Sequence, residues 1–360
     1  MNAQRQRLKI DLMCRGIKPT DAALKVLPQG KFGQVLVRDY PTTSGMIVSL
    51  FDDLPVNLPL RMDHREAVSL DYDATGFFLR VNQESLPVRV LSPPDYALNN
   101  RRLANGRPVR NVVNTHADRI RLTPLYGCGF SCQYCNYPGM VYRSNTLAEL
   151  LEGVDMALKD RIHGSPHILV SGGTPRAEEP EYRSLNEIYE ALPGSHPELT
   201  WDLMLAPRTL HTGTPTKKKY INFLDFLKKA GFSGLSINLE IFNTELRLRH
   251  IPEKAKIGID GYLEFMELAV ERFGLGHVRS VILAGLEPME ETLKGVEALA
   301  QRGVLPEISP FTADPGAFLA RAAEPQADEL FLLWEMATEL MNRHNMENQP
   351  FCQSCSHNIL

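Results

Sequence analysis

The segment Leu125-Tyr-Gly-Cys-Gly-Phe-Ser-Cys-Gln-Tyr-Cys-Asn-Tyr-Pro138 carries the strongest signal in the chain. Its cysteines, Cys128, Cys132 and Cys135, are spaced as C-x3-C-x2-C. Thiolates hold iron–sulfur clusters, and a cubic cluster contains four irons. Three thiolates from one loop therefore leave one iron open to a small molecule. Zinc prefers four protein ligands in paired C-x2-C knuckles, and no second pair lies nearby in the sequence.

The overall composition is that of an ordinary globular protein. The chain has 360 residues, of which 43% are apolar and 23% charged, and its net charge is −4. Nothing in this balance favours nucleic acid or an anionic membrane as a partner. No apolar run approaches the length of a membrane span, and no apolar segment follows the basic N-terminus. Six cysteines, three of them clustered, indicate metal ligation in a reducing compartment, so we expect a cytoplasmic protein.

Residues 1–110 are predicted to form a small, mostly β accessory module. Two helices are expected first, at 5–12 and 20–26. Short β-like runs separated by turn residues follow at 33–38, 45–50, 67–72, 76–81 and 87–91. The polar, turn-rich segment 99–108 favours a linker.

Strand-like and helix-like segments alternate from about residue 119 onward. The predicted strands cover 120–124, 167–171, 201–205, 234–241, 278–285 and 305–311. The predicted helices cover 146–162, 185–192, 220–230, 259–273 and 290–302. Repeated βα units with apolar strands predict a parallel sheet with helices outside, and six units are fewer than the eight that close a barrel. We therefore predict an α/β fold, a partial, open (β/α)6 TIM-type barrel, over residues 111–318.

Residues 319–360 are predicted to form a C-terminal helix, at 327–344, followed by a cysteine-containing tail. In a (β/α) barrel, the chemistry takes place at the C-terminal ends of the strands. The loop of three cysteines follows the first predicted strand, so it lies where this rule expects the active site.

A C-x3-C-x2-C loop after the first strand of a partial barrel resembles the radical S-adenosylmethionine (radical SAM) superfamily. The resemblance covers roughly residues 115–315. It implies that Cys128, Cys132 and Cys135 hold a catalytic [4Fe–4S] cluster whose open iron binds SAM. One electron, from a reductant such as flavodoxin or ferredoxin, then cleaves SAM to methionine and a 5′-deoxyadenosyl radical. That radical abstracts a hydrogen atom from the substrate.

Further residues match positions at which the superfamily contacts SAM. Tyr134 resembles the aromatic residue near adenine, with a packed loop aromatic as the alternative. Gly172, Gly173 and Thr174 resemble the glycine-rich turn near the SAM amino group, because glycine permits close backbone approach. Ala284 lies in a segment that resembles the apolar strand beside adenine, with plain core packing as the alternative.

Polar residues on the fourth predicted strand are the remaining SAM candidates. Strand alternation places Asn238 and Glu240 on one face, and the resemblance implies contacts with the SAM ribose. Arg247 resembles the arginine that pairs with the SAM carboxylate, since a guanidinium matches a carboxylate. Arg249 is the alternative. The stretch 235–311 is most similar to the biotin synthase-like branch, and the N-terminal module to biotin synthase-related proteins with such an extension.

Three cysteines remain outside the loop: Cys14, Cys352 and Cys355. They could hold a second, auxiliary iron–sulfur cluster. Alternatively, the C-terminal pair and His357 form half of a zinc site, or the pair is a redox couple and Cys14 fills an apolar gap. An auxiliary cluster in the biotin synthase-like branch favours sulfur insertion at an unactivated carbon.

Other outcomes stay open from the sequence. They are modification of a peptide or natural product, an isomerisation, and, for a non-enzyme, an iron–sulfur scaffold or maturation protein. The substrate could be a small molecule, a peptide or a carrier-bound group.

Overall fold

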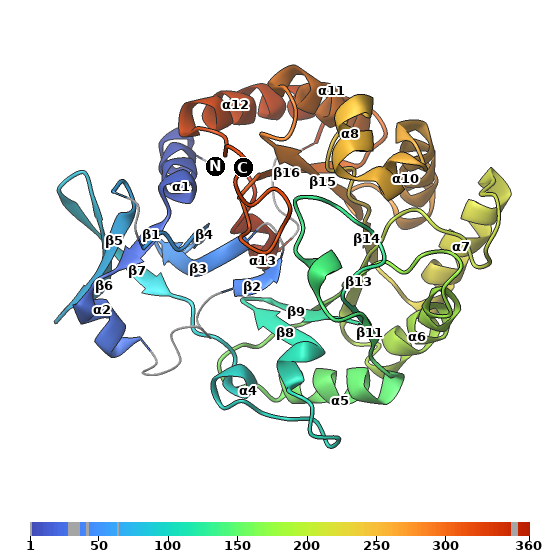
Figure 1. Ribbon diagram of the computed structural model, residues 1–360, viewed down its shortest axis with the longest axis horizontal. Helices are drawn as coiled ribbons and strands as arrows, with labels where there is room; N and C mark the ends of the chain where they lie inside the picture. The colour runs from blue at the N-terminus through green and yellow to red at the C-terminus, as the bar shows by residue number, and fades with distance from the viewer. Residues whose placement is uncertain (1, 28–36, 41–42, 63–64, 347–351) are drawn as a thin grey trace.

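The computed structural model describes residues 2–27, 37–40, 43–62, 65–346 and 352–360. A strongly curved parallel sheet with helices on its outer face forms the larger part, and a mostly antiparallel sheet lies beside it (Figure 1). None of the described helices is both long and apolar enough to span a membrane.

The curved sheet contains six parallel strands paired in chain order. They are β9 (Arg119–Leu122), β12 (His167–Val170), β13 (Thr200–Met204), β14 (Gly234–Ser236), β15 (Val278–Ala284) and β16 (Leu305–Pro310). An additional strand, β8 (Val113–His116), pairs antiparallel with β9 at one edge. The sheet stays open, because its two edge strands, β8 and β16, do not pair with each other among the described residues. The predicted open (β/α)6 barrel is confirmed.

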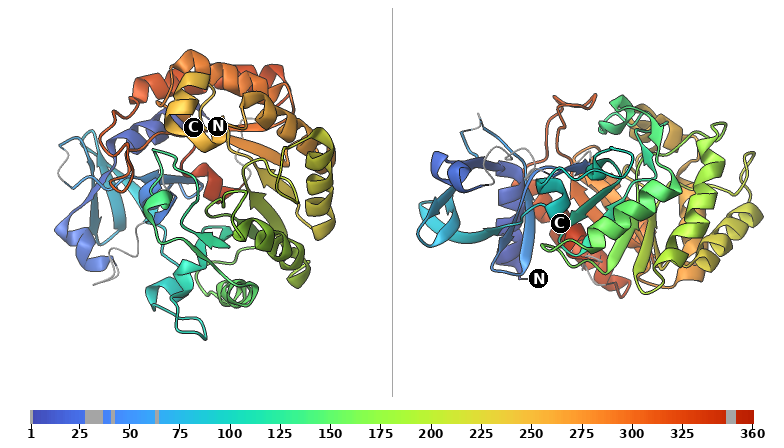
Figure 2. Two further views of the ribbon diagram at one scale, coloured as in Figure 1. Left: turned by 45° about the vertical axis from the view of Figure 1, so that its right-hand side comes forward. Right: turned by 90° about the horizontal axis from the view of Figure 1, so that it is seen from below.

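Amphipathic helices cover the outer face of this sheet (Figures 1 and 2). They are α5 (Leu147–Leu158), α6 (Glu181–Ser195), α7 (Lys217–Ala230), α10 (Ile259–Phe273), α11 (Met289–Ala300) and α12 (Ala327–Arg343). The start of α5 is fixed by a capping box, in which Thr146 and Glu149 satisfy each other's backbone N–H groups. Its apolar face, with Leu150 and Val154 fully buried, packs into the main core.

Shorter elements precede or connect these units. They are α4 (Asp95–Leu98), η1 (Val109–Asn111), β10 (Leu125–Tyr126), η2 (Tyr137–Gly139), β11 (Arg143–Ser144), α8 (Thr244–His250) and α9 (Pro252–Ala255). The β10–β11 pair closes the base of the cysteine loop, because the two strands bracket it in the sequence.

The fourth strand is shorter than its apolar sequence predicts. Regular pairing stops at Ser236. Beyond it, the described residues form one isolated bridge to β15, between Glu240 and Ile282, and single hydrogen bonds such as that from the N–H of Ile237 to the carbonyl of Arg279. Glu240 has a φ of 67°, which is outside the extended region. The N–H of Leu239 accordingly bonds to the hydroxyl of Ser280, rather than to a strand carbonyl.

The N-terminal part forms a sheet in the order β1-β5-β6-β7-β3-β2, with β4 paired to β3. Its elements are α1 (Ala3–Arg15), β1 (Ile17–Pro19), α2 (Asp21–Val26), β2 (Val37–Tyr40), β3 (Thr43–Leu50), β4 (Leu54–Leu58), β5 (Val68–Asp73), β6 (Gly76–Val81) and β7 (Glu84–Val90). Residues 33–36 of one predicted strand lie outside the described residues. The sequence missed β1 and β4, each of which is short and contains a proline. The domain boundaries at 110 and 318 stay predictions.

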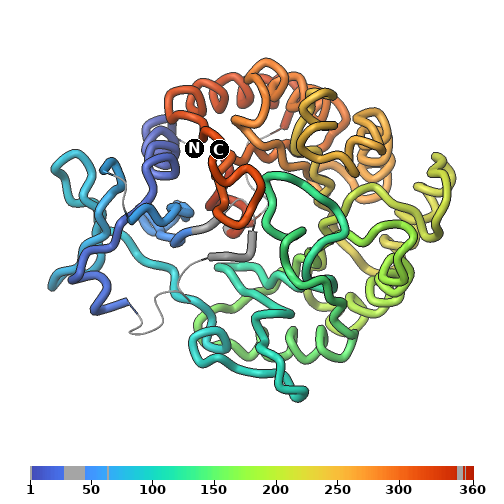
Figure 3. Tube along the Cα trace, viewed as in Figure 1, coloured from blue at the N-terminus to red at the C-terminus, as the bar shows by residue number. Residues whose placement is uncertain are grey.

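The C-terminal tail, residues 352–360, bonds to both edge strands of the curved sheet. The two ends of the chain lie close together in the trace (Figure 3). It contains the single turn α13 (Gln353–Ser356). At one end, the hydroxyl of Ser354 donates to the carbonyl of His116 on β8. At the other end, the N–H of Leu360 donates to the carbonyl of Ile308 on β16 over 2.8 Å. The tail thereby links the first and last strands of the barrel.

The N-terminal module holds the same tail from the other side. Lys9 on α1 is buried, and its Nζ donates to the carbonyl of Ser356 over 2.6 Å. The N–H of Asn57 on β4 donates to the carbonyl of His357 over 2.7 Å. The tail is therefore packed between the module and the barrel.

Candidate active site

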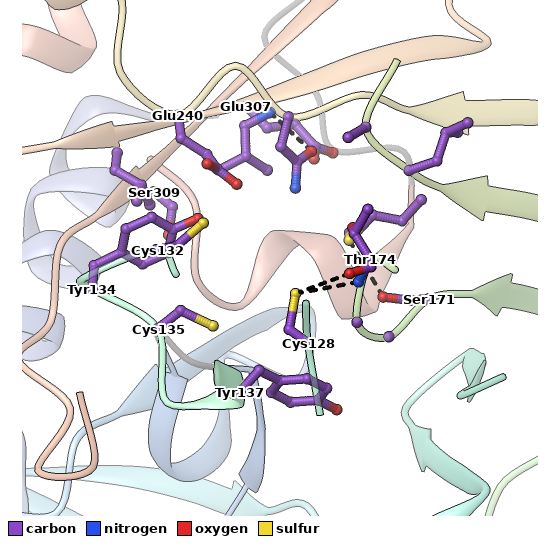
Figure 4. Close-up of a pocket in the computed structure, with 18 of the residues that line it drawn as sticks. Cys128, Cys132, Tyr134, Cys135, Tyr137, Ser171, Thr174, Glu240, Glu307 and Ser309 are labelled. Atoms are coloured by element: carbon purple, nitrogen blue, oxygen red, sulfur yellow. Dashed lines mark hydrogen bonds between the residues drawn. The ribbon is translucent and has the colours of Figure 1, made fainter. Parts of the chain in front are cut away.

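A cavity runs through the interior of the barrel, and its space measures about 1180 Å³ when the open mouth is included. The cysteine loop borders it at the C-terminal ends of the strands (Figure 4). Cys355 and Ile359 of the tail border it as well. The cavity therefore joins the two cysteine-containing segments of the chain.

Cys128, Cys132 and Cys135 face one open space, with Tyr134 and Glu240 on one side and Thr174 on another (Figure 4). Among the described residues, no three His, Cys, Asp or Glu side chains come close enough together to hold a single metal ion. Spaced thiols on one open space fit a cluster, in which each thiolate binds a different iron. Burial raises the pKa of Cys135 to about 12 and that of Cys132 well above its usual range. Metal binding is what makes such thiols ionise.

Glycine allows the turn after β12 to press against the cysteine loop. A Cβ on Gly173 would lie 1.6 Å from the carbonyl oxygen of Gly127, so only glycine fits. The turn also bonds to the loop: the N–H of Thr174 lies 3.2 Å from the sulfur of Cys128, and the N–H of Gly129 donates to the carbonyl of Thr174 over 2.9 Å. These contacts fix the first cysteine relative to β12.

Glu240 and Lys254 form a buried ion pair in the cavity wall. Lys254 Nζ lies 2.5 Å from Glu240 Oε1, and the side chains are 12% and 7% exposed. Although burial opposes ionisation, the Glu240 carboxylate raises the pKa of Lys254. The second oxygen, Glu240 Oε2, is buried without a hydrogen-bond partner among the described residues. An acceptor left open in this way fits a ligand that brings a donor, such as a ribose hydroxyl.

The other residues expected to contact SAM fall into two groups. Tyr134, Gly172, Gly173, Thr174 and Asn238 all line the cavity. Arg247 and Ala284 do not belong to its lining.

Arg247 instead supports the irregular segment after β14. Its Nη1 donates to the carbonyls of Leu239 and Ile241, and the guanidinium packs over the ring of Tyr262. On β15, the alternation turns Val281 and Leu283 toward the cavity, so Ala284 lies in the core under the helices. The structure thus offers Lys254, which the sequence did not single out, as a cation at this end of the cavity.

Of the charged residues near the N-terminal ends of the strands, Arg119, Arg279 and Glu307 line the far end of the cavity. Arg279 on β15 donates to Asp202 Oδ2 on β13 over 2.8 Å, and His167 on β12 lies 3.0 Å from the same oxygen. Glu307 on β16 lies 3.8 Å from Arg279, and burial raises the pKa of Glu307 to about 8. The sequence could have predicted this charged end of the cavity, because Asp202, Arg279 and Glu307 are charged residues within otherwise apolar strands.

The C-terminal cysteines meet this charged floor, and Cys14 does not. The sulfurs of Cys352 and Cys355 are 3.4 Å apart. Arg119 Nη1 lies 2.9 Å from the sulfur of Cys355 and 3.6 Å from that of Cys352. Cys14 lines a separate, smaller cavity, where its sulfur lies 3.8 Å from the carbonyl oxygen of Pro325.

Comparison with known families identifies the central part of this architecture. Residues 122–300 match the model of the Radical SAM superfamily. The matched segment makes up just under half of the chain and is similar to the radical SAM superfamily. The cysteine loop, Cys128 to Cys135, lies within the matched segment. The superfamily binds a [4Fe–4S] cluster and SAM, and the three thiols, the Gly173 turn and the open oxygen of Glu240 fit these groups.

The individual relatives of this chain are distant. The bacteriochlorophyllide c C-7(1)-hydroxylase of Chlorobaculum limnaeum is 27% identical over 263 residues, covering 66% of this chain and 64% of the relative. The chain thus spans just under two thirds of that relative's length.

Two solved structures are also similar. Methylornithine synthase PylB is 17% identical with a TM-score of 0.47, covering 65% of this chain and 64% of that one. The FeFe-hydrogenase maturase HydG of Carboxydothermus hydrogenoformans is 22% identical with a TM-score of 0.47, covering 62% and 51%. None of these matches singles out the biotin synthase-like branch.

Proposed function

We propose that this protein is a radical SAM enzyme that abstracts a hydrogen atom from a substrate held inside the barrel. When bound, the cluster and SAM supply a 5′-deoxyadenosyl radical for this step. The observation that carries the proposal is the position of Cys128, Cys132 and Cys135 on one open space at the C-terminal ends of the strands. The name of the Chlorobaculum relative, a hydroxylase, agrees with chemistry at a C–H bond.

The residues around the cysteine loop have distinct parts in this proposal. The three thiolates hold the cluster. Tyr134 and Glu240, which border the same space, contact the nucleoside of SAM in this proposal. Glu240 Oε2, which has no hydrogen-bond partner among the described residues, accepts a hydrogen bond from a hydroxyl of the nucleoside. The Gly173 turn brings backbone groups close to the loop. Lys254 pairs with Glu240 in a buried place, where the ion pair offsets the loss of hydration of both groups.

The proposal includes an external reductant such as flavodoxin or ferredoxin. SAM cleavage consumes one electron, which the cluster passes on and must receive from outside the protein. A reducing compartment such as the cytoplasm also belongs to it, because all six cysteines are free thiols. Membership of the biotin synthase-like branch is proposed on the sequence around Asn238 and Glu240 alone.

Sulfur insertion at an unactivated carbon is the second candidate. Its support is that Cys355 lines the same cavity as the cluster cysteines, so a sulfur-donating auxiliary cluster there would face the substrate. It needs more ligands than the two neighbouring thiols, and Cys14 lines another cavity. An auxiliary cluster would raise iron from about four to about seven or eight per chain.

The experiment is anaerobic incubation of the reconstituted protein with dithionite and SAM. We expect 5′-deoxyadenosine from the wild-type protein and from Cys14→Ala, and none from Cys132→Ala, which lacks one cluster ligand. Absence of 5′-deoxyadenosine from the wild-type protein with a full iron content would favour the alternative, an iron–sulfur scaffold or maturation protein.

A further inference from the structure

Cys352 and Cys355 share an environment that suits sulfur chemistry of their own. Their sulfurs are 3.4 Å apart, whereas a disulfide bond is about 2.05 Å long, so a small movement of two side chains would join them. The two residues stand three positions apart across the single turn α13. No backbone rearrangement over a long distance is needed.

The surrounding contacts hold this turn in place. The backbone N–H of Ser354 donates to Asp118 Oδ1 over 3.1 Å, and the carbonyl of Ser356 accepts from Lys9 over 2.6 Å. The N–H of Asn57 holds the next carbonyl, that of His357. These anchors before and after Cys355 hold the turn that brings the two sulfurs together.

The two cysteines differ in exposure, and the difference assigns their roles. Cys355 is 7% exposed and lines the barrel cavity, whereas Cys352 is partly exposed. Arg119 lies against both sulfurs and favours a thiolate in the pair. The hydrogen bond with Cys355, followed by the Arg119 charge, lowers the pKa of Cys352 to about 7. Cys352 is thus the accessible nucleophile, and Cys355 is the buried partner.

The same contacts disfavour a metal at this place. The described residues hold no group of three His, Cys, Asp or Glu side chains around one point here. Arg119 already supplies a cation to both sulfurs, and Arg279 adds a second positive charge to the same floor. A metal ion would have to compete with these guanidinium groups.

We propose that Cys352 and Cys355 form a redox-active dithiol in the wall of the barrel cavity, which converts reversibly to an intramolecular disulfide. Its reaction partner is a disulfide, R–S–S–R, of a small thiol or a protein. The Cys352 thiolate attacks one sulfur of the partner, forming a mixed disulfide and releasing one thiolate. Cys355 loses its proton to that thiolate and attacks the sulfur of Cys352. The second thiolate leaves, takes up one proton from water, and the partner ends as two thiols.

The chemical group that the pair presents to the cavity differs between the reduced and the oxidised state. In the reduced state, Cys355 presents a thiol to the cavity, and in the oxidised state it presents a disulfide. The proposal does not depend on the radical chemistry of the other end of the cavity, because the exchange requires neither SAM nor a substrate.

The test is an anaerobic titration of the cluster-loaded, full-length protein in buffers of reduced and oxidised glutathione. After acid quenching and alkylation, peptide mass spectrometry counts the thiols at each cysteine. We expect a Cys352–Cys355 disulfide that forms and disappears reversibly with the glutathione ratio, whereas Cys14 stays a thiol. Cys355→Ser should trap glutathione on Cys352, and Cys352→Ser should take up none there. Cys14→Ser is the matched control, and its Cys352–Cys355 disulfide should form at the same glutathione ratio as in the wild-type protein.

Two results would overturn the proposal. The first is a wild-type pair that stays reduced at the most oxidising ratio; this result needs no variant and so does not depend on whether a substitution folds. The second is a wild-type iron content of about seven or eight per chain that falls to about four in the Cys352→Ala/Cys355→Ala variant, which would make the pair cluster ligands. Neither result bears on 5′-deoxyadenosine formation, so this proposal and the proposed enzyme activity can fail separately.

Discussion

At the scale of single residues, the site is governed by a few buried charges. Glu240 is 5% exposed, and a carboxylate so placed is stable only with a partner. Lys254 is that partner, at 2.5 Å, and it comes from the short helix α9 rather than from a strand. The cation next to the cluster loop is therefore set by how a loop folds back over the barrel.

Replacing Lys254 should leave Glu240 as an uncompensated buried charge. We expect Lys254→Met to lower the free energy of unfolding by about 3–5 kcal/mol, as for other broken buried ion pairs. Lys256→Met, at an exposed position two residues away, is the control and should change it by less than about 0.5 kcal/mol. Urea unfolding of both variants measures the difference. Equal midpoints for the two would show that the pair contributes nothing.

At the scale of elements, the barrel helices begin where their caps fix them. Glu149 in the capping box of α5 also accepts from Arg107 Nη1 over 2.6 Å, which ties the helix start to the segment before β8. Although burial acts in the opposite sense, the hydrogen bonds from Arg107 and Thr146 lower the pKa of Glu149 from 4.5 to about 2. A single carboxylate therefore fixes both a helix and its neighbour.

This lowered pKa makes the stability of α5 depend on pH. The stabilisation from Glu149 is complete above pH 4.5, where the carboxyl is ionised in both states, and is lost as the pH falls toward 2. We expect Glu149→Gln to cost about 1.5–3 kcal/mol at pH 7. The difference from wild type should shrink when unfolding is measured between pH 4.5 and 3. Glu187→Gln, on the exposed side of α6, should give no such trend. A difference that stays constant with pH would contradict the assignment.

At the scale of the whole molecule, the tail lies between the two sheet edges that a closed barrel would join with further strands. Residues 352–360 bond to β8, to β16 and to the N-terminal module, and they bring Ile359 and Leu360 into the buried interior. The open barrel therefore depends on contacts between the two ends of the chain (Figures 1 and 3).

Removing the tail should destabilise the whole fold. A chain that ends at Met346 loses the buried side chains of Ile359 and Leu360, each worth about 1.5–3 kcal/mol, besides its hydrogen bonds. We expect a loss of at least about 4 kcal/mol and a lower thermal midpoint. Ser354→Ala removes only the bond to His116 and should cost about 1 kcal/mol. An unchanged midpoint after truncation would show that the tail does not hold the barrel edges together.

The sequence by itself determined the alternation of βα units, the cysteine loop and the glycine turn of the second unit. These features are local: hydrophobic periodicity, ligand spacing and backbone freedom can each be read within a short stretch. The six parallel strands follow directly from that alternation. Gly127 follows β9 and Gly173 follows β12, and the two glycines meet because these strands are neighbours in the sheet.

Only the tertiary structure decided which distant residues share the cavity. Arg247 supports a loop, while Lys254 faces Glu240, because the strand ends early at Ser236 and its register is lost. Cys355 reaches Arg119, and Cys14 does not join them, because the tail is positioned by Lys9, Asn57 and the sheet edges. The contacts of the tail join residues hundreds of positions apart, and no local pattern in the chain encodes which of them meet.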